Sequence, residues 1–438
     1  MAFSIRSGHK IAVAALAALA CSVATVAAPA LAASGPTPAR PSQGAGRGMD
    51  GEALQHDLDL VTRAGAIAVV GAARGSHQWW RGASGVRSID AARTARPGDT
   101  FRVGSITKTM IATLALQQVQ AHTWKLTTRV GDVLPGLLPG HERVTLEQLL
   151  SHRSGLPDYF GTLLAGAQTP DQLLAALHRP YTDAQLVAAA LQQPWLFRPG
   201  TDYSYSNTEY VVVGMMLERA THHSVAYLLR SRIFVPAGMR SSTYPTRLPG
   251  FRGAHLSEYA LFERPYNFDA TNPSIFSSAG AVVSTASDLD RFYRALFTGR
   301  LLPMNLVRNM ATPRTVKAGD PAYGLGIYLV GDPCPGPKGQ QQYLYGHDGA
   351  TFGTLSTAFT SPDGKRQASV NFTGRDYLTA APPTTKLAND FLIDAFSQTC
   401  PRPVSANAKK KAAAQFAQAL RGSAATTQAP AQAPALRR

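Results

Sequence analysis

The sequence predicts an α+β fold in which one antiparallel sheet, flanked by helices, is built from both ends of the chain and an all-α subdomain is inserted between them. Strand patterns occur near the start of the body and return late in the chain, and helical patterns lie between them. Strands at both ends with helices between them favour one sheet over separate domains. With 438 residues, 45% of them hydrophobic, the chain can bury a large core.

Residues 1–32 are typical of a secretion signal. A short basic start precedes an apolar run over 11–26, and Ala30-Leu31-Ala32 supplies a small-x-small cleavage pattern. A membrane anchor is the alternative, but the run is short and rich in alanine. A lipoprotein signal would use Cys21, which follows a poor lipobox. We therefore expect a protein that is secreted or associated with the cell envelope, and that is not transmembrane after processing.

Three further segments follow the signal. Residues 33–50 are rich in Ser, Gly, Pro and Arg and are predicted to be a flexible leader, and residues 51–400 form the folded domain. Residues 401–438 are a basic, low-complexity tail with seven Lys or Arg and no acid, within a net charge of +16 for the whole chain. A plain solvated surface is our preferred interpretation of this charge. A cell-wall polymer is the candidate anionic partner of an exported protein, and nucleic acid is not expected.

The elements of the domain follow in order. A hairpin is expected over 67–85, with a turn at Arg74-Gly75, and an amphipathic helix over 105–120. Further helices are expected over 145–150, 182–191, 209–221 and 286–297, late strands over 323–330, 342–345, 354–359 and 366–372, and a closing helix over 384–398. The turn Ser361-Pro362-Asp363-Gly364 joins the last two strands. A helix over 409–420 is possible, but nothing obvious covers it.

Ser105 and Lys108 form a Ser-x-x-Lys motif at the start of the predicted helix 105–120. Residues three apart share a helix face, so the hydroxyl and the amine can meet. A serine hydroxyl needs a nearby base to act as a nucleophile, and a buried lysine can serve when its pKa is lowered. The motif alone is a weak signal, since a helix cap followed by a surface lysine gives the same pattern.

A second motif, Tyr205-Ser206-Asn207, strengthens this interpretation. On an extended loop the phenol and the carboxamide two residues apart point the same way. Tyr205 can take the serine proton and pass it to the leaving group, and Asn207 can donate to a substrate carbonyl and contact Lys108. The sequence leaves open whether Lys108 or Tyr205 is the base.

A third motif, His347-Asp348-Gly349-Ala350, follows a predicted strand. On an edge strand it would form the opposite wall of a cleft. The backbone N–H groups of Ala350 and Ser105 would then make an oxyanion hole, in which one donor is worth about 3–4 kcal/mol in other enzymes.

These three motifs, in this order and spacing, resemble those of the serine DD-carboxypeptidase and class C β-lactamase superfamily, and most of all the secreted DD-carboxypeptidases of actinomycetes. The resemblance covers roughly residues 54–400. It implies the β-lactamase/DD-peptidase-like fold, a penicillin-binding serine hydrolase, no cofactor and an acyl-enzyme on Ser105. It also implies that Tyr159, Phe276 and Tyr328 line the cleft, and that the tail is processed away.

The third motif departs from the carboxypeptidases that it resembles. There, threonines and an arginine grip the terminal carboxylate of the substrate; the corresponding positions here are Asp348, Ala350 and Tyr328. An aspartate would repel a carboxylate and could attract an amine. Alternatively, Asp348 points away from the cleft and anchors a turn, since strand neighbours face opposite sides.

Two cysteines, Cys334 and Cys400, remain after cleavage of the signal. In an oxidising compartment they could form a disulfide, which the resemblance also implies; two unpaired thiols are the alternative. His152 is interpreted as a structural hydrogen-bonding residue rather than a catalyst. No grouping has metal-ligand spacing and no phosphate loop occurs, so neither a metal nor another cofactor is expected.

The sequence therefore predicts a hydrolase that acts on a small substrate. D-amino-acid peptides, including the stem peptides of peptidoglycan, rank first, followed by the substrates of esterases or D-aminopeptidases, and then β-lactams. A non-catalytic protein of the cell envelope that retains the fold is the second hypothesis, and the intact set of Ser105, Lys108, Tyr205 and Asn207 argues against it.

Overall fold

The computed structural model describes residues 48–419 except 249, 316 and 380, and all of these belong to one compact unit over 38–438. The predicted signal over 1–32, nearly all of the leader, and the tail beyond 419 lie outside the described residues. No helix among the described residues is long and apolar enough to cross a bilayer.

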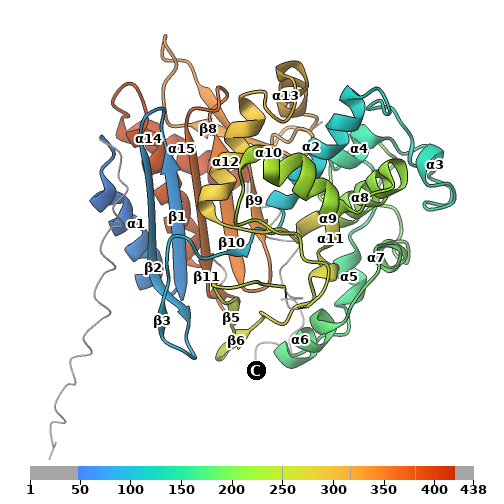
Figure 1. The fold of residues 1–438 in the computed structure, drawn as a ribbon, viewed down its shortest axis with the longest axis horizontal. Coiled ribbons are helices and arrows are strands. Elements are labelled where there is room, and N and C mark those ends of the chain that lie inside the picture. The colour runs from blue at the N-terminus through green and yellow to red at the C-terminus, as the bar shows by residue number, and fades with distance from the viewer. Residues whose placement is uncertain (1–47, 249, 316, 380, 420–438) are drawn as a thin grey trace, which may run out of the picture. The chain divides into compact units, whose positions relative to one another are not determined.

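A seven-stranded sheet contains strands from both ends of the domain, which confirms the expected α+β class (Figure 1). The strand order is β3-β2-β1-β11-β10-β9-β8, and every neighbouring pair is antiparallel. The strands span Ala68–Arg74 (β1), Trp79–Ser88 (β2), Arg93–Thr94 (β3), Tyr328–Asp332 (β8), Gln342–Ala350 (β9), Thr354–Thr360 (β10) and Gln367–Thr373 (β11). The N-terminal hairpin therefore pairs, through β1, with β11, which is the last strand of this sheet along the chain.

Helices pack on both faces of this sheet (Figure 1). One face carries α1 (Gly51–Arg63), α14 (Pro383–Gln398) and α15 (Ala406–Ala419), and the other carries α2 (Ile106–Gln120) and α12 (Ala286–Phe297). The apolar side chains divide accordingly into two buried clusters, one on each side of the strands. Helix α2 is buried along nearly all of its length, because the sheet lies on one side and other helices on the other.

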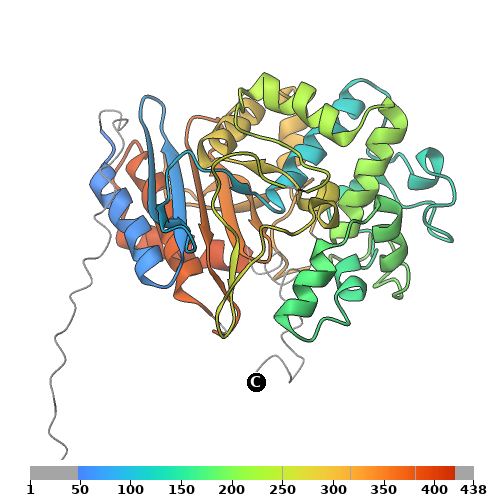
Figure 2. The same cartoon turned by 60° about the horizontal axis from the view of Figure 1, so that its bottom comes forward.

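The inserted segment forms the helical layer beside α2 (Figure 2). It consists of α3 (Val130–Val133), α4 (Leu146–Leu150), α5 (Tyr159–Leu163), α6 (Pro170–His178), α7 (Asp183–Ala190), α8 (Asn207–Thr221), α9 (Val225–Leu229), the π-helical turn η1 (Arg230–Phe234), α10 (Val235–Ala237), the 3-10 turn η2 (Pro273–Ile275), α11 (Ser277–Gly280) and α13 (Met304–Ala311). Two small sheets connect it to the rest, made of β4 (Phe101–Arg102) with β7 (Val283–Ser284), and of β5 (Tyr259–Leu261), β6 (Pro265–Asn267) and β12 (Arg375–Asp376).

Two expectations about these elements were wrong. The strand expected over 323–330 begins only at Tyr328, because residues 323–327 form a tight turn in which Gly326 has φ +76° and lies against Ala112. The helix expected near the C-terminus is covered: α15 packs on α14 and β8, and it buries Phe416 and Ala412. The low-complexity composition of this segment hid that apolar stripe.

Candidate active site

The candidate nucleophile Ser105 lies immediately before α2, where residues 103–105 cross the end of β9 at close range. Gly104 has φ +53°, and a Cβ added there would lie 2.7 Å from the backbone nitrogen of Ala350. The hydroxyl of Ser356 donates to the carbonyl oxygen of Val103 at 2.8 Å and fixes this crossing. Only glycine fits at position 104, and the close approach brings the backbone of Ser105 beside the end of β9.

Lys108 lies one turn into α2, is fully buried, and points back at Ser105. Its Nζ is 3.0 Å from Ser105 Oγ, 2.7 Å from Asn207 Oδ1 and 2.9 Å from the carbonyl oxygen of Ala279. Burial lowers the pKa of Lys108 to about 7, although the nearby carboxylates of Asp158, Asp348 and Glu209 raise it. In a large fraction of the molecules, Lys108 is therefore uncharged at neutral pH.

Two of the three partners of Lys108 can only accept hydrogen bonds. The amide of Asn207 is oriented by Asp158, whose carboxylate accepts both from Asn207 Nδ2 and from its backbone N–H at 2.7 Å. A neutral amine has two hydrogens and one lone pair. With the hydrogens directed to Asn207 and Ala279, the lone pair faces the hydroxyl of Ser105. Asp158 and Ala279 were not assigned roles from the sequence.

Tyr205 lies over Lys108, with its ring centroid 4.8 Å from Nζ. Burial raises the pKa of Tyr205 well above its usual value, while the neighbouring Ser105 hydroxyl lowers it. The phenol therefore stays protonated at neutral pH. Its ring packs against His152 with the centroids 4.1 Å apart.

His152 is fully buried and forms a pair with Glu209 beneath the Tyr205 loop. Its Nδ1 contacts Glu209 Oε2 and is 3.3 Å from the backbone nitrogen of Ser206, and the other carboxylate oxygen of Glu209 accepts from the backbone N–H of Ser154. Burial raises the pKa of Glu209 well above its usual value and lowers that of His152 well below its own. These buried hydrogen bonds hold the segment that carries Tyr205, which agrees with the structural interpretation of His152. Glu209 lies in no recognised motif, so sequence reasoning missed it.

His347 lies on β9 with its ring centroid 6.3 Å from that of Tyr205, and it is fully buried. Nδ1 donates to the carbonyl oxygen of Asp348 at 2.5 Å, and Nε2 accepts from the hydroxyl of Tyr323 at 3.0 Å. Burial lowers the pKa of His347. The imidazole is therefore neutral and held in one tautomer.

The remaining residues of the third motif surround the same place. The Asp348 carboxylate is almost buried and lies 3.4 Å from His347 Nδ1. Gly349 crosses Val103 so closely that a Cβ on it would lie 1.9 Å from the Val103 carbonyl oxygen. The structure thus brings Ser105, Lys108, Tyr205, Asn207 and His347 together, with Asp348, Gly349 and Ala350 beside them.

The three predicted cleft-lining aromatics are all buried. The Tyr159 hydroxyl donates to the carbonyl oxygen of Ile275 at 2.5 Å, the Phe276 ring is tilted against that of Phe352, and Tyr328 packs against His347. Their contact with a substrate stays a prediction. Among the described residues, no group of three His, Cys, Asp or Glu side chains is arranged to bind a metal ion.

Cys334 and Cys400 are joined by a disulfide with a Cα–Cα distance of 5.6 Å. It ties the loop after β8 to the end of α14. The interpretation as two unpaired thiols does not describe this structure.

Comparison with known proteins gives matches along most of the chain. The family model described as Beta-lactamase matches residues 59–388. Penicillin-binding protein 4 of Amycolatopsis lactamdurans is 32% identical over 63% of this chain and 72% of its own length. A D-aminopeptidase of Cereibacter sphaeroides is 28% identical over 74% of this chain, which spans only 60% of that relative.

A solved structure has a similar fold. The D-stereospecific amidohydrolase from a Streptomyces species matches with a TM-score of 0.66 and 31% identity, covering 74% of this chain and 94% of that one. The matched region contains all three motifs described above.

Proposed function

Because this chain belongs to the β-lactamase family of serine hydrolases, we propose that it hydrolyses its substrates through an acyl-enzyme on Ser105, with Lys108 as the acylation base. The observation that carries the proposal is the contact of Lys108 Nζ with Ser105 Oγ at 3.0 Å in a site where the amine has its pKa lowered to about 7. Tyr205 is less suited to this role, because burial raises its pKa well above the usual value and keeps the phenol protonated at neutral pH.

The reaction proceeds in two steps. Lys108 takes the hydroxyl proton as Ser105 Oγ attacks the substrate carbonyl carbon, and the backbone N–H groups of Ser105 and Ala350 bind the resulting oxyanion. The tetrahedral intermediate collapses as the leaving amine or alcohol receives a proton, which Tyr205 relays from Lys108. In the second step, a water molecule attacks the carbonyl carbon of the acyl-enzyme ester. The proton transfers then run in the reverse direction, and the acid product and free Ser105 are released.

We further propose that the substrate is an amide or short peptide of a D-amino acid with a free amino group. The buried carboxylate of Asp348 beside His347 supports this, since it favours a cation and disfavours the terminal carboxylate of a D-Ala-D-Ala peptide. The Streptomyces amidohydrolase and the D-aminopeptidase relatives agree with it. D-Ala-D-Ala carboxypeptidase activity is the second candidate, favoured by the 32% identity to penicillin-binding protein 4.

The test compares D-alanine amide, its N-acetylated form and an N-acetylated peptide ending in D-Ala-D-Ala. We expect the free amine to be preferred, and the Asp348→Thr variant to lose that preference. Faster cleavage of the acetylated D-Ala-D-Ala peptide by the wild type would instead support the carboxypeptidase.

A separate control tests the acyl-enzyme itself. A fluorescent fluorophosphonate should label the wild type and not Ser105→Ala, with both proteins folded by circular dichroism. Failure of labelling, of amide hydrolysis and of p-nitrophenyl ester hydrolysis in folded wild type would favour a non-catalytic binding protein. We also propose export through the predicted signal, which detection of the mature protein in the culture medium would test.

A further inference from the structure

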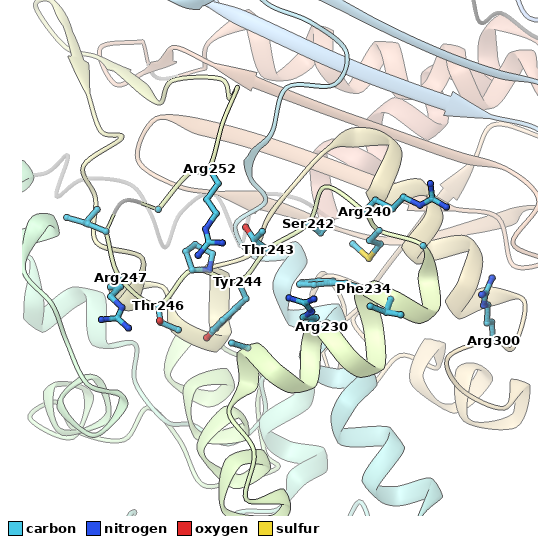
Figure 3. Close-up of a pocket in the computed structure, with 17 residues that line it drawn as sticks. Arg230, Phe234, Arg240, Ser242, Thr243, Tyr244, Thr246, Arg247, Arg252 and Arg300 are labelled. Atoms are coloured by element: carbon cyan, nitrogen blue, oxygen red, sulfur yellow. The ribbon is translucent and has the colours of Figure 1, made fainter.

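A groove of about 990 Å³ is formed by the segment that follows α9 and by the end of α12 (Figure 3). None of the residues that line it belongs to the site around Ser105. Its lining includes five arginines from separate places in the chain: Arg230, Arg240, Arg247, Arg252 and Arg300. In the view of Figure 3, Arg247 lies toward one end and Arg300 toward the other, with Arg230, Arg252 and Tyr244 between them.

These arginines have no anionic partner within the described part of the chain. All five are exposed, no Asp or Glu lines the groove, and none of the five guanidinium groups makes a hydrogen bond or an ion pair there. Other arginines of the same molecule do find carboxylates, such as Arg102 with Glu258 and Arg366 with Asp332. The groove is therefore a place where positive charge gathers without compensation.

Unpaired like charges on one concave surface repel one another and create a positive potential, which is only partly screened at the roughly 8 Å Debye length of physiological salt. Because the described residues supply no carboxylate partner to these five arginines, an external anion would stabilise the arrangement. A guanidinium presents a planar fork of N–H donors that matches two oxygens of a phosphate.

The rest of the lining suits the same class of ligand. Thr243 and Thr246 present exposed hydroxyls beside the arginines, and hydroxyl groups share phosphate oxygens with arginine at many binding sites. Val235, Tyr244 and Leu248 add an apolar component that is at least partly exposed, against which the uncharged parts of a chain can lie. A single small anion would satisfy only the arginines around it, whereas these are spread along the groove (Figure 3).

We propose that this groove binds a linear polymer that carries regularly spaced phosphate groups. The binding is electrostatic and reversible, involves no chemistry at Ser105, and does not depend on the proposed hydrolase activity. It would hold the enzyme at a phosphate-rich polymer while the separate site around Ser105 remains open to small substrates.

The experiment measures the binding of fluorescently labelled linear polyphosphate to the full chain by anisotropy at several salt concentrations. The groove variant is Arg230→Gln/Arg247→Gln/Arg252→Gln. The matched control, Arg63→Gln/Arg143→Gln/Arg219→Gln, removes the same charge from exposed arginines outside the groove. We expect the groove variant to raise Kd at least about tenfold and to flatten the salt dependence, because each phosphate contact releases counterions. The control should bind as the wild type does.

Three outcomes would overturn the proposal. Equal loss of binding in both triple variants would show that polyphosphate binding depends only on the net charge of the protein. Wild-type binding by the groove variant would show that polyphosphate binds elsewhere. Equal affinity for polyglutamate, or for vesicles of anionic phospholipid, would contradict a phosphate polymer as the ligand. An unchanged thermal unfolding transition by circular dichroism in both triple variants serves as the check on folding, and inorganic phosphate should compete only weakly.

Discussion

The amine of Lys108 lies 3.0 Å from the hydroxyl of Ser105, and its two other partners, Asn207 Oδ1 and the Ala279 carbonyl, can only accept hydrogen bonds. When the amine is neutral, this leaves its lone pair for the serine proton. The base is thus oriented by the acceptors around it, before any substrate binds.

The first prediction concerns pH. The pKa of Lys108 is lowered to about 7, and only the uncharged amine can take the serine proton, so kcat/KM should rise as the pH increases through about 7. The rate of p-nitrophenyl ester hydrolysis between pH 5 and 9 measures this. Lys108→Ala should remain folded and lose acylation; a normal acylation rate in that variant would refute the role of the lysine.

Asp158→Asn tests the group behind the base. The carboxylate of Asp158 raises the pKa of Lys108, so its removal should move the ascending limb of the pH profile to lower pH. It also orients Asn207, and loss of a charged hydrogen bond costs about 1.5–3 kcal/mol, so plateau kcat/KM should fall roughly ten- to hundredfold. An unchanged limb, or one moved to higher pH, would contradict this assignment.

Glu209 offers a comparison of two substitutions. If the buried carboxyl is protonated and donates to His152, Glu209→Gln can replace it, with its amide N–H donating to Nδ1 and its oxygen accepting from Ser154. We expect Glu209→Gln to unfold in urea within about 1 kcal/mol of the wild type and Glu209→Ala to lose about 2–4 kcal/mol, because the alanine leaves buried polar groups unsatisfied. Equal destabilisation by both would mean that the carboxylate is charged.

The disulfide gives a prediction about stability. Cys334 and Cys400 are 66 residues apart, and closing such a loop restricts the unfolded chain by roughly 2–4 kcal/mol. The oxidised wild type should therefore melt at a higher temperature than Cys334→Ala/Cys400→Ala. Reductant should lower the Tm of the wild type and leave that of the double variant unchanged; a shift in both would exclude the disulfide as its cause.

The α+β class and the elements that carry the three motifs could be predicted from local sequence patterns alone. Helix spacing places Lys108 one turn after Ser105, and the alternation of apolar residues predicts the late strands, because these patterns are local and survive in any context. The same local patterns wrongly predicted a strand at residues 323–327 and an uncovered helix at α15. Both segments pack against parts of the chain that are distant in sequence.

The groups that complete the site could be identified only once the chain was folded. Asp158, Glu209 and Ala279 have no motif of their own, yet folding brings them within hydrogen-bonding distance of Asn207, His152 and Lys108. Burial, which shifts the pKa of Lys108 toward neutrality and that of Tyr205 away from it, depends on packing between segments about 100 residues apart. Sequence patterns name the reactive groups, but desolvation and orientation arise only when the chain closes around them.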